Sequence, residues 1–166
     1  MAHFAKLNSS KEVVKVHVVP NDACPNDTEE EGITYLNKVW SVNNVDWKKC
    51  SYNTHHNIHG LGGTPYRGNY PGVGFIYDEA NEIFLPPKPF ASWSKDVPNA
   101  RWAPPVARPA EEYTTTEDDH GGWFVFWDEP NTRWIGYNGA NATSGQAATD
   151  TAPYRWEPSN NTWILI

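Results

Sequence analysis

The sequence is poor in the aliphatic residues from which most protein cores are built. Leu, Ile, Val and Phe together number 30 of 166 residues, about 18%, and there are only 5 Leu and 1 Met. So little leucine argues against a helical bundle, and the low combined share of Leu, Ile, Val and Phe would on its own indicate disorder. However, the chain carries 9 Trp, 8 Tyr and 6 Phe, and disordered chains are poor in aromatic residues. We therefore expect a folded chain whose core is built from rings.

Several classes of protein are excluded by what is missing. No apolar run approaches the length that spans a bilayer, and no basic stretch followed by an apolar run opens the chain, so we expect neither a membrane span nor a secretory signal. The net charge of −7 argues against nucleic acid as a partner. Cys24 and Cys50 are the only cysteines and neither lies in a CxxC pair. We expect two buried or idle thiols in a protein made in a reducing cytoplasm.

The N-terminal residues predict a β-hairpin. Residues 3–7 form its first strand, residues 8–11 its turn and residues 12–19 a second strand rich in valine. Val14, Val16 and Val18 alternate, which indicates one apolar face. His17 falls on the other face and is interpreted as a solvated strand histidine.

One helix is predicted after a loop over residues 20–28. Thr28 and Glu31 have the spacing of a capping box, in which each side chain bonds a free backbone amide of the first turn. Apolar residues follow at helical spacing: Ile33, Leu36 and Trp40. Residues 41–44 end the helix. The three acids of its first turn, Glu29, Glu30 and Glu31, are interpreted as capping and solubilising residues rather than catalytic carboxylates.

From Gly74 onward a short pattern recurs four times. An aromatic residue, often followed by an acid, leads into a turn with Asn or Pro and is answered by a second aromatic residue. The eight rings are candidate packing or interface residues: Tyr77 with Phe84, Trp93 with Trp102, Trp127 with Trp134, and Trp156 with Trp163. Each unit predicts a short β-hairpin, and Pro130 and Pro158 favour wide type I turns. Isolated hairpins are marginal, so these units must pack on each other, on the N-terminal part or on a partner.

Acid pairs stand at matching points of these hairpins. Asp78-Glu79 and Asp128-Glu129 precede their turns in the same way. A catalytic pair of carboxylates would occur once, not in copies. We therefore interpret these acids as turn-forming residues that bond their own backbone.

The fold class that follows is mainly β with one helix in the N-terminal half. An α+β region over residues 1–70 ends in an irregular Gly-rich stretch, and tandem aromatic hairpins occupy residues 71–166. Proline-rich connectors at residues 86–89 and 104–109 should be extended. Residues 111–122 are predicted to be an acidic loop, and residues 138–152 a flexible linker.

Little in the sequence points to chemistry. His55, His56 and His59 form the only dense cluster of metal-ligand types, but they lie in a Gly-rich loop without an HExxH pattern. We favour structural histidines, and a metal site at these histidines stays the alternative, which Asp118, Asp119 and His120 would join only if the fold brings them near. Residues 60–64 lack the lysine of a phosphate-binding loop, and no GxSxG occurs. We therefore assign no catalytic residue, metal or cofactor and expect no enzyme.

Several longer motifs in the sequence resemble those of a known group of proteins. They are Gly72-Val73-Gly74-Phe75-Ile76-Tyr77-Asp78-Glu79, Phe84-Leu85-Pro86-Pro87-Lys88-Pro89-Phe90 with Ser92-Trp93, Trp102-Ala103-Pro104-Pro105, and the opening Met1-Ala2-His3-Phe4-Ala5-Lys6. This pattern resembles a group of small proteins from tailed phages of marine cyanobacteria, and the resemblance covers most of residues 1–135. It implies a phage-encoded protein that is a component of the virion, and it implies no site residues.

These observations lead to one expected function and two alternatives. We expect a virion structural protein that is made in the host cytoplasm and decorates the capsid exterior, or else is an accessory on the tail. Its partners are then other virion proteins, in a symmetric assembly of many copies. The first alternative is a tail-associated module that binds a receptor or glycan by stacking sugars on exposed tryptophans. The second is an intracellular enzyme or host-modifying factor that uses the histidine cluster.

Overall fold

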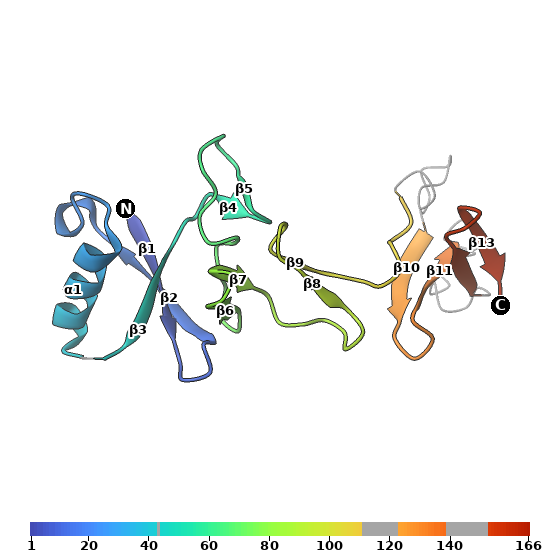
Figure 1. Ribbon diagram of the computed structural model, residues 1–166, viewed down its shortest axis with the longest axis horizontal. Coiled ribbons are helices and arrows are strands. Elements are labelled where there is room, and N and C mark those ends of the chain that lie inside the picture. The colour runs from blue at the N-terminus through green and yellow to red at the C-terminus, as the bar shows by residue number, and fades with distance from the viewer. Residues whose placement is uncertain (43, 111–122, 139–152) are drawn as a thin grey trace, which may run out of the picture. The chain divides into compact units, whose positions relative to one another are not determined.

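The computed structural model describes residues 1–42, 44–110, 123–138 and 153–166 (Figure 1). Contacts divide the chain into two compact units. Unit 1 comprises Met1–Pro89 and Lys95–Trp102, and unit 2 comprises Phe90–Ser94 and Ala103–Ile166. The predicted fold class is confirmed, because the described residues form small antiparallel sheets and a single α-helix. The predicted acidic loop, and the predicted linker beyond residue 138, lie outside the described residues.

The first nine strands and the helices follow one another from the N-terminus. They are β1 (Ala2–Leu7), β2 (Val13–Val19), the 3-10 helix η1 (Asn21–Ala23), α1 (Glu29–Trp40), β3 (Asp46–Cys50), β4 (Thr54–His55), β5 (Ile58–His59), β6 (Ile76–Asp78), β7 (Ile83–Leu85), β8 (Ser94–Asp96) and β9 (Arg101–Ala103). Four further strands belong to unit 2: β10 (Trp123–Asp128), β11 (Arg133–Asn138), β12 (Tyr154–Glu157) and β13 (Thr162–Leu165). No helix among the described residues is long and apolar enough to cross a membrane.

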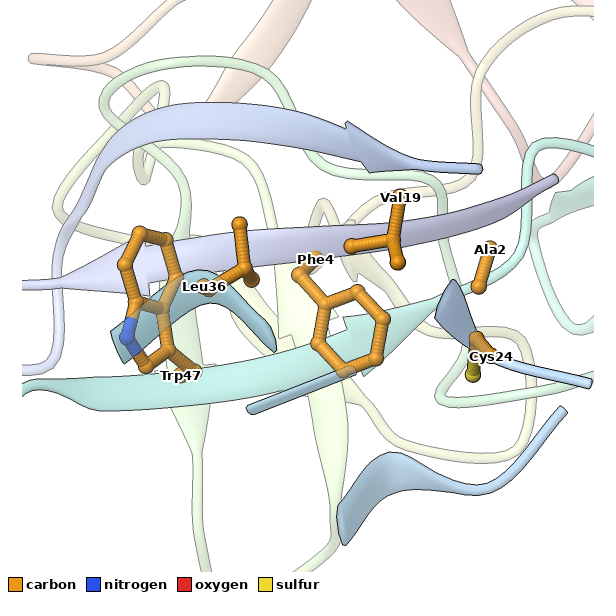
Figure 2. Close-up of a cluster of buried hydrophobic side chains, with 6 residues drawn as sticks. All are labelled: Ala2, Phe4, Val19, Cys24, Leu36 and Trp47. Atoms are coloured by element: carbon orange, nitrogen blue, oxygen red, sulfur yellow. The ribbon is translucent and has the colours of Figure 1, made fainter. Parts of the chain in front are cut away.

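The predicted N-terminal hairpin exists and gains a third strand. β1 lies between β2 and β3 in an antiparallel sheet with the order β2-β1-β3. One face of this sheet is covered by α1 and forms the first core (Figure 2). Phe4 from β1, Leu36 from α1 and Trp47 from β3 are buried there. The core of this region is thus built around two rings, as the composition indicates.

The valines of β2 do not form the predicted apolar face. Val14 and Val18 are 43% and 50% exposed, whereas Val13 and Val19 are buried. A register shift between Lys6 and Leu7 of β1 accounts for Val14, because it brings Val13 rather than Val14 opposite Leu7. Val16 packs against the cluster that contains Val13 and Leu7, whereas Val18, two residues further along the same face, is exposed. The alternation of apolar and polar residues along a strand does not reveal such a bulge.

His17 is also not the solvated histidine that the sequence indicates. Its ring lies edge-on between the rings of Trp40 and Trp47, with centroid distances of 5.2 and 5.1 Å. Burial, followed by the charges of Lys15 and Lys6, lowers the pKa of His17. The imidazole therefore acts as a packing ring on the helix-covered side of the sheet.

The second face of the sheet is covered by the hairpin of β6 and β7. Tyr77 and Phe84 are buried against Ala5, Leu7 and Cys50, among others. This packing places residues 71–89 in the same compact unit as the N-terminal sheet. The contacts therefore do not divide the chain at residue 70 as predicted, because the first hairpin buries its rings on the N-terminal sheet.

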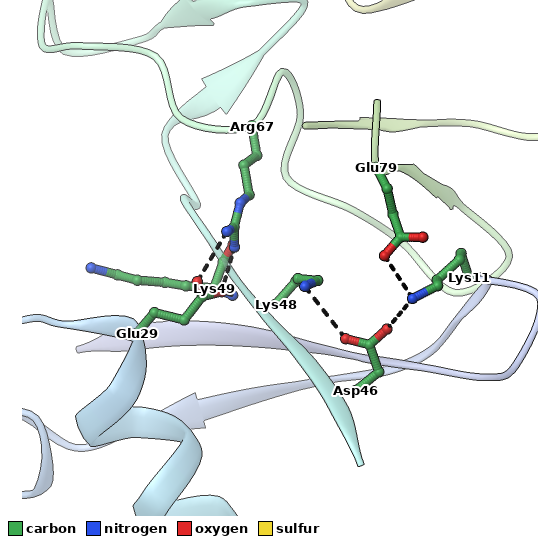
Figure 3. A network of polar contacts seen from close by, with 7 residues as sticks. All are labelled: Lys11, Glu29, Asp46, Lys48, Lys49, Arg67 and Glu79. Atoms are coloured by element: carbon green, nitrogen blue, oxygen red, sulfur yellow. Dashed lines mark hydrogen bonds and ion pairs between the residues drawn. The ribbon is translucent and has the colours of Figure 1, made fainter. Parts of the chain in front are cut away.

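The predicted helix is confirmed at both ends. Thr28 and Glu31 form the capping box, and Ser41 ends the helix in the left-handed conformation. Trp40 was predicted on the apolar face but is 51% exposed. Glu29 does more than cap or solubilise, because it accepts a hydrogen bond from Nη2 of Arg67 at 3.0 Å (Figure 3). This pair fastens the start of α1 to a loop 38 residues away.

Candidate functional site

The four hairpins share a turn built from an acid and its neighbours. Asp78, Asp96 and Asp128 each accept a hydrogen bond from the asparagine three residues further on. In each turn the residue before the second strand adopts a positive φ, as at Ala100 and Thr132. The predicted turn-forming role of the acids at 78 and 128 is confirmed. The conformation is a wide turn, which Pro130 can enter.

A cation often completes these turns. Arg133 donates to Asp128 at 2.8 Å, and Arg101 donates to Asp96 at 3.0 Å. The hydrogen bond from Arg133 is the main cause that lowers the pKa of Asp128, and the bond from Lys95 does the same for Asp78. Each acid is therefore ionised at neutral pH and already bonded, Asp96 and Asp128 within their own turns and Asp78 also to Lys95 of β8, which leaves no free carboxylate pair for catalysis among these three.

Glu129 has a different role from the acid beside it. It accepts hydrogen bonds from the backbone amide and the hydroxyl of Ser92, at 2.7 and 2.6 Å. The indole Nε1 of Trp127 also donates to it, at 2.7 Å. Glu129 thus ties the segment at Ser92 to the sheet of unit 2, so only the first acid of this pair forms the turn.

The first predicted ring pair is present. Tyr77 and Phe84 face each other across β6 and β7, with ring centroids 4.9 Å apart. Both side chains are buried, with 4% and 0% exposed. Their place beneath the N-terminal sheet makes them packing residues.

The second predicted pair is wrong, because its two rings belong to different clusters. Trp102 packs against Ile83 and Leu85 in unit 1, and its Nε1 donates to the carbonyl of Pro86. Trp93 lies in unit 2, edge-on to Trp127 at 6.1 Å. The spacing of nine residues, against seven in the other hairpins, was the only sign of a difference.

The remaining four rings form one row across the sheet of unit 2. This sheet has the order β10-β11-β12-β13. Trp127 stands opposite Trp134, and Trp156 stands opposite Trp163, with centroid distances of 5.1 and 5.3 Å. The register of β11 with β12 brings Trp134 next to Trp156. Each strand thus contributes one tryptophan to the same face.

Segments outside the sheet cover this tryptophan row. Phe90, Trp93 and Val106 pack against it, and Nε1 of Trp134 donates to the carbonyl of Val106 at 2.9 Å. Trp127, Trp134 and Trp156 are buried, and Trp93 and Trp163 are half-buried. These rings therefore make the core of unit 2.

The opposite face of β10 and β11 exposes apolar side chains. Phe124 and Phe126 are 47% and 52% exposed. Phe126 lies edge-on to Tyr137, with centroids 6.4 Å apart, and stands opposite Ile135. We call these four residues the outer aromatic face. This face was not predicted from the sequence. Phe124 and Phe126 are two residues apart and Trp127 follows directly, which indicates that one strand carries rings on both faces.

A polar cleft of about 280 Å³ opens beside the start of β1 in unit 1. His3 and Tyr52 line it, and Nδ1 of His3 lies 3.0 Å from the hydroxyl of Tyr70. Burial, followed by the N-terminal amine, lowers the pKa of His3. Burial also raises the pKa of the neighbouring Cys50 to about 12. This thiol is therefore protonated at neutral pH and is no nucleophile.

The other thiol resembles Cys50. Cys24 is buried and free, and burial raises its pKa. The prediction of two buried thiols is confirmed.

The histidine loop is held by its own backbone. Nδ1 of His59 accepts hydrogen bonds from the amides of Leu61 and Gly63, at 3.2 and 3.0 Å. Within the part of the chain that the structure describes, no group of three or more His, Cys, Asp or Glu side chains could hold a metal ion. Residues 118–120, the other members of the alternative metal site, lie outside that part.

Comparison with known proteins adds no relative. No family model, no curated protein and no solved structure matches this chain.

Proposed function

We propose that this chain is a structural protein of a phage particle that decorates the capsid exterior. Its motifs resemble those of small proteins of tailed phages, which supports the phage context. The observation that carries the proposal is the outer aromatic face, where Phe124 and Phe126 are about half exposed. Exposed apolar surface marks interaction sites, and aromatic residues are enriched at the centres of interfaces.

The arrangement of unit 2 suits docking. The tryptophan row is packed on one face, so the sheet is held rigid from behind. The outer aromatic face then presents rings whose positions are fixed by strand pairing rather than by loops. A pre-ordered surface loses little conformational entropy on binding, which favours attachment to a fixed lattice of other virion proteins.

The packing of the tryptophans makes the glycan-binding alternative less favourable. Sugar stacking needs indole faces open to solvent. Trp127, Trp134 and Trp156 use those faces against one another, and Trp93 lies edge-on to two of them. A glycan would then have to stack on other exposed rings, such as the phenylalanines of the outer aromatic face or Trp40 of unit 1.

Mass spectrometry of purified particles tests the proposal. The protein should be present in a fixed ratio to the major capsid protein, and it should stay with capsids when capsids and tails are separated. Phages that encode Phe126→Ser should assemble with less of the protein. The matched control is Leu61→Ser, which also removes an exposed apolar side chain, 80% exposed, but lies in unit 1.

The outcomes separate the candidates. Absence from purified particles would overturn the proposal in both its capsid and its tail form. Presence on tails only, with binding to host polysaccharide that Phe126→Ser abolishes, would select the tail-associated module. Equal incorporation of the Phe126→Ser protein and the Leu61→Ser protein would show that the outer aromatic face is not the docking surface.

A further inference from the structure

The two edge strands of the N-terminal sheet differ in whether their outward backbone groups have hydrogen-bond partners. The outer edge of β3 is covered by side chains: the amide of Lys49 donates to Oε1 of Glu29 at 2.6 Å, and Nη1 of Arg67 donates to the carbonyl of Lys49 at 2.9 Å (Figure 3). These bonds occupy backbone groups that another strand could otherwise use. Strand addition on this side is thus blocked at Lys49.

The same bonds show which groups of β2 point outward. Since Lys49 directs its amide and carbonyl away from β1, the opposite residue Phe4 directs its own toward β2. Phe4 pairs with His17, so His17 bonds to β1. By alternation, Val16 and Val18 direct their amides and carbonyls to the free edge.

Little else occupies this edge. Gly74 and Phe75 bond to the amide and carbonyl of Val13 at the start of β2. From Val14 to the end of the strand, the described residues supply no further backbone partner on that side. The side chains of Val14 and Val18 are about half exposed. A seven-residue strand with neither proline nor bulge over its last five residues is a template for another strand.

The sequence of β2 is compatible with a second copy of the same strand as its partner. The strand Val13–Val19 has valine at five of its seven positions, and its one lysine is Lys15. An antiparallel pair of such strands about a two-fold axis at His17 places Val16 opposite Val18 of the other copy. It places Lys15 opposite Val19, so the lysines do not face each other and the pairing is compatible in charge. Burial lowers the pKa of His17, which leaves the imidazoles at the axis uncharged at neutral pH.

We propose that the free edge of β2 pairs with β2 of a second copy of this chain, which joins two three-stranded sheets into one. The pairing uses the outward groups of Val16 and Val18 on both copies and covers the exposed valines. It needs no other virion protein, so it is tested on the purified full-length chain, independently of particle incorporation.

Sedimentation velocity over a range of concentrations is the first test. The wild-type chain should form dimers, and Val18→Lys should weaken dimerisation at least about tenfold, because it places a charge directly opposite Val16 of the other copy, where the wild-type pairing sets valine against valine. The matched control is Val39→Lys, which adds the same charge at a side chain of similar exposure, 52%, on α1. This control should dimerise like the wild type.

Hydrogen exchange locates the interface. The amides of Val16 and Val18 should be protected in the wild-type dimer and should exchange rapidly in the Val18→Lys monomer, while the amide of His17 stays protected in both. A monomeric wild type would overturn the inference. So would a dimer that survives Val18→Lys but is lost in Phe126→Ser, because its interface would then be the outer aromatic face. Circular dichroism would show whether the Val18→Lys chain is unfolded. In that case Val18→Thr, which keeps the β-branched shape, replaces it, and the exchange rate of the Val16 amide decides whether the edge of β2 is paired.

Discussion

Gly32 of α1 lies directly over the ring of Phe4 in β1. A Cβ built on this glycine would lie 2.0 Å from Cζ of the phenylalanine, which no real contact allows. The helix therefore approaches the sheet at the one position without a side chain. The ring of Phe4, which is fully buried, fills the space that another residue at position 32 would need.

Gly32→Ala should therefore destabilise the protein, although alanine is the better helix former. Overpacking in a filled core costs about 1–3 kcal/mol, which exceeds the gain of about 1 kcal/mol in helix propensity. Urea unfolding should show a lower midpoint. Thr34→Ala, at an exposed position of the same helix, is the control and should be neutral or slightly stabilising. Equal stability of the two variants would contradict the close contact.

Trp127→Ala should cost about 3–5 kcal/mol of unfolding free energy in unit 2, the range for removal of a large buried ring. The change empties one place in the tryptophan row and leaves Glu129 without its indole donor. Phe126→Ala is the matched control one residue away, because that ring points to the exposed outer face. Thermal unfolding followed by tryptophan fluorescence measures both, and a loss below about 1 kcal/mol for Trp127→Ala would show that the row is not a core.

Much of the fold follows from local signals. The capping box of Thr28 and Glu31 marks the start of α1 because both bonds lie within one turn. The opposition of Tyr77 and Phe84 follows from the turn between them. In each case the residues that decide the structure are neighbours in sequence.

Other features depend on residues that are far apart. The bond between Glu29 and Arg67 joins positions 38 residues apart, and no pattern in either segment indicates it. The burial of Phe84 on the N-terminal sheet and the separation of Trp93 from Trp102 depend on which surfaces meet in three dimensions. Spacing alone could identify the rings but could not assign them to clusters.

The pair of Glu29 and Arg67 gives a third prediction. Burial disfavours ionisation of Glu29, but the hydrogen bonds from Arg67 and from the amide of Lys49 outweigh it and lower its pKa. Glu29→Gln should cost about 1–2 kcal/mol, since it replaces a charge-assisted bond by a neutral one at a partly exposed site. Glu30→Gln, exposed on the same turn, should change stability little. Chemical unfolding at neutral pH compares them, and equal losses would contradict a specific role for the pair.

The last prediction concerns pH and rests on His17. Burial between Trp40 and Trp47, and then the charges of Lys15 and Lys6, lowers its pKa in the folded chain. In the unfolded chain the imidazole returns to about 6.5. As the pH falls below that value, the unfolded state binds the proton first, so the stability present above about pH 6.5 is lost progressively.

His17→Gln should therefore flatten the dependence of unfolding free energy on pH between about pH 7 and pH 5. Lys15→Met keeps the imidazole but removes one of the charges that lower its pKa, so it should flatten the same dependence less. His3, whose pKa is also lowered by burial, accounts for a remaining slope that His3→Gln should reduce further. Urea titrations at closely spaced pH values measure all three. A slope in His17→Gln as steep as in the wild type would mean that His17 is as easily protonated in the folded chain as in the unfolded one, which is incompatible with a ring held between two indoles.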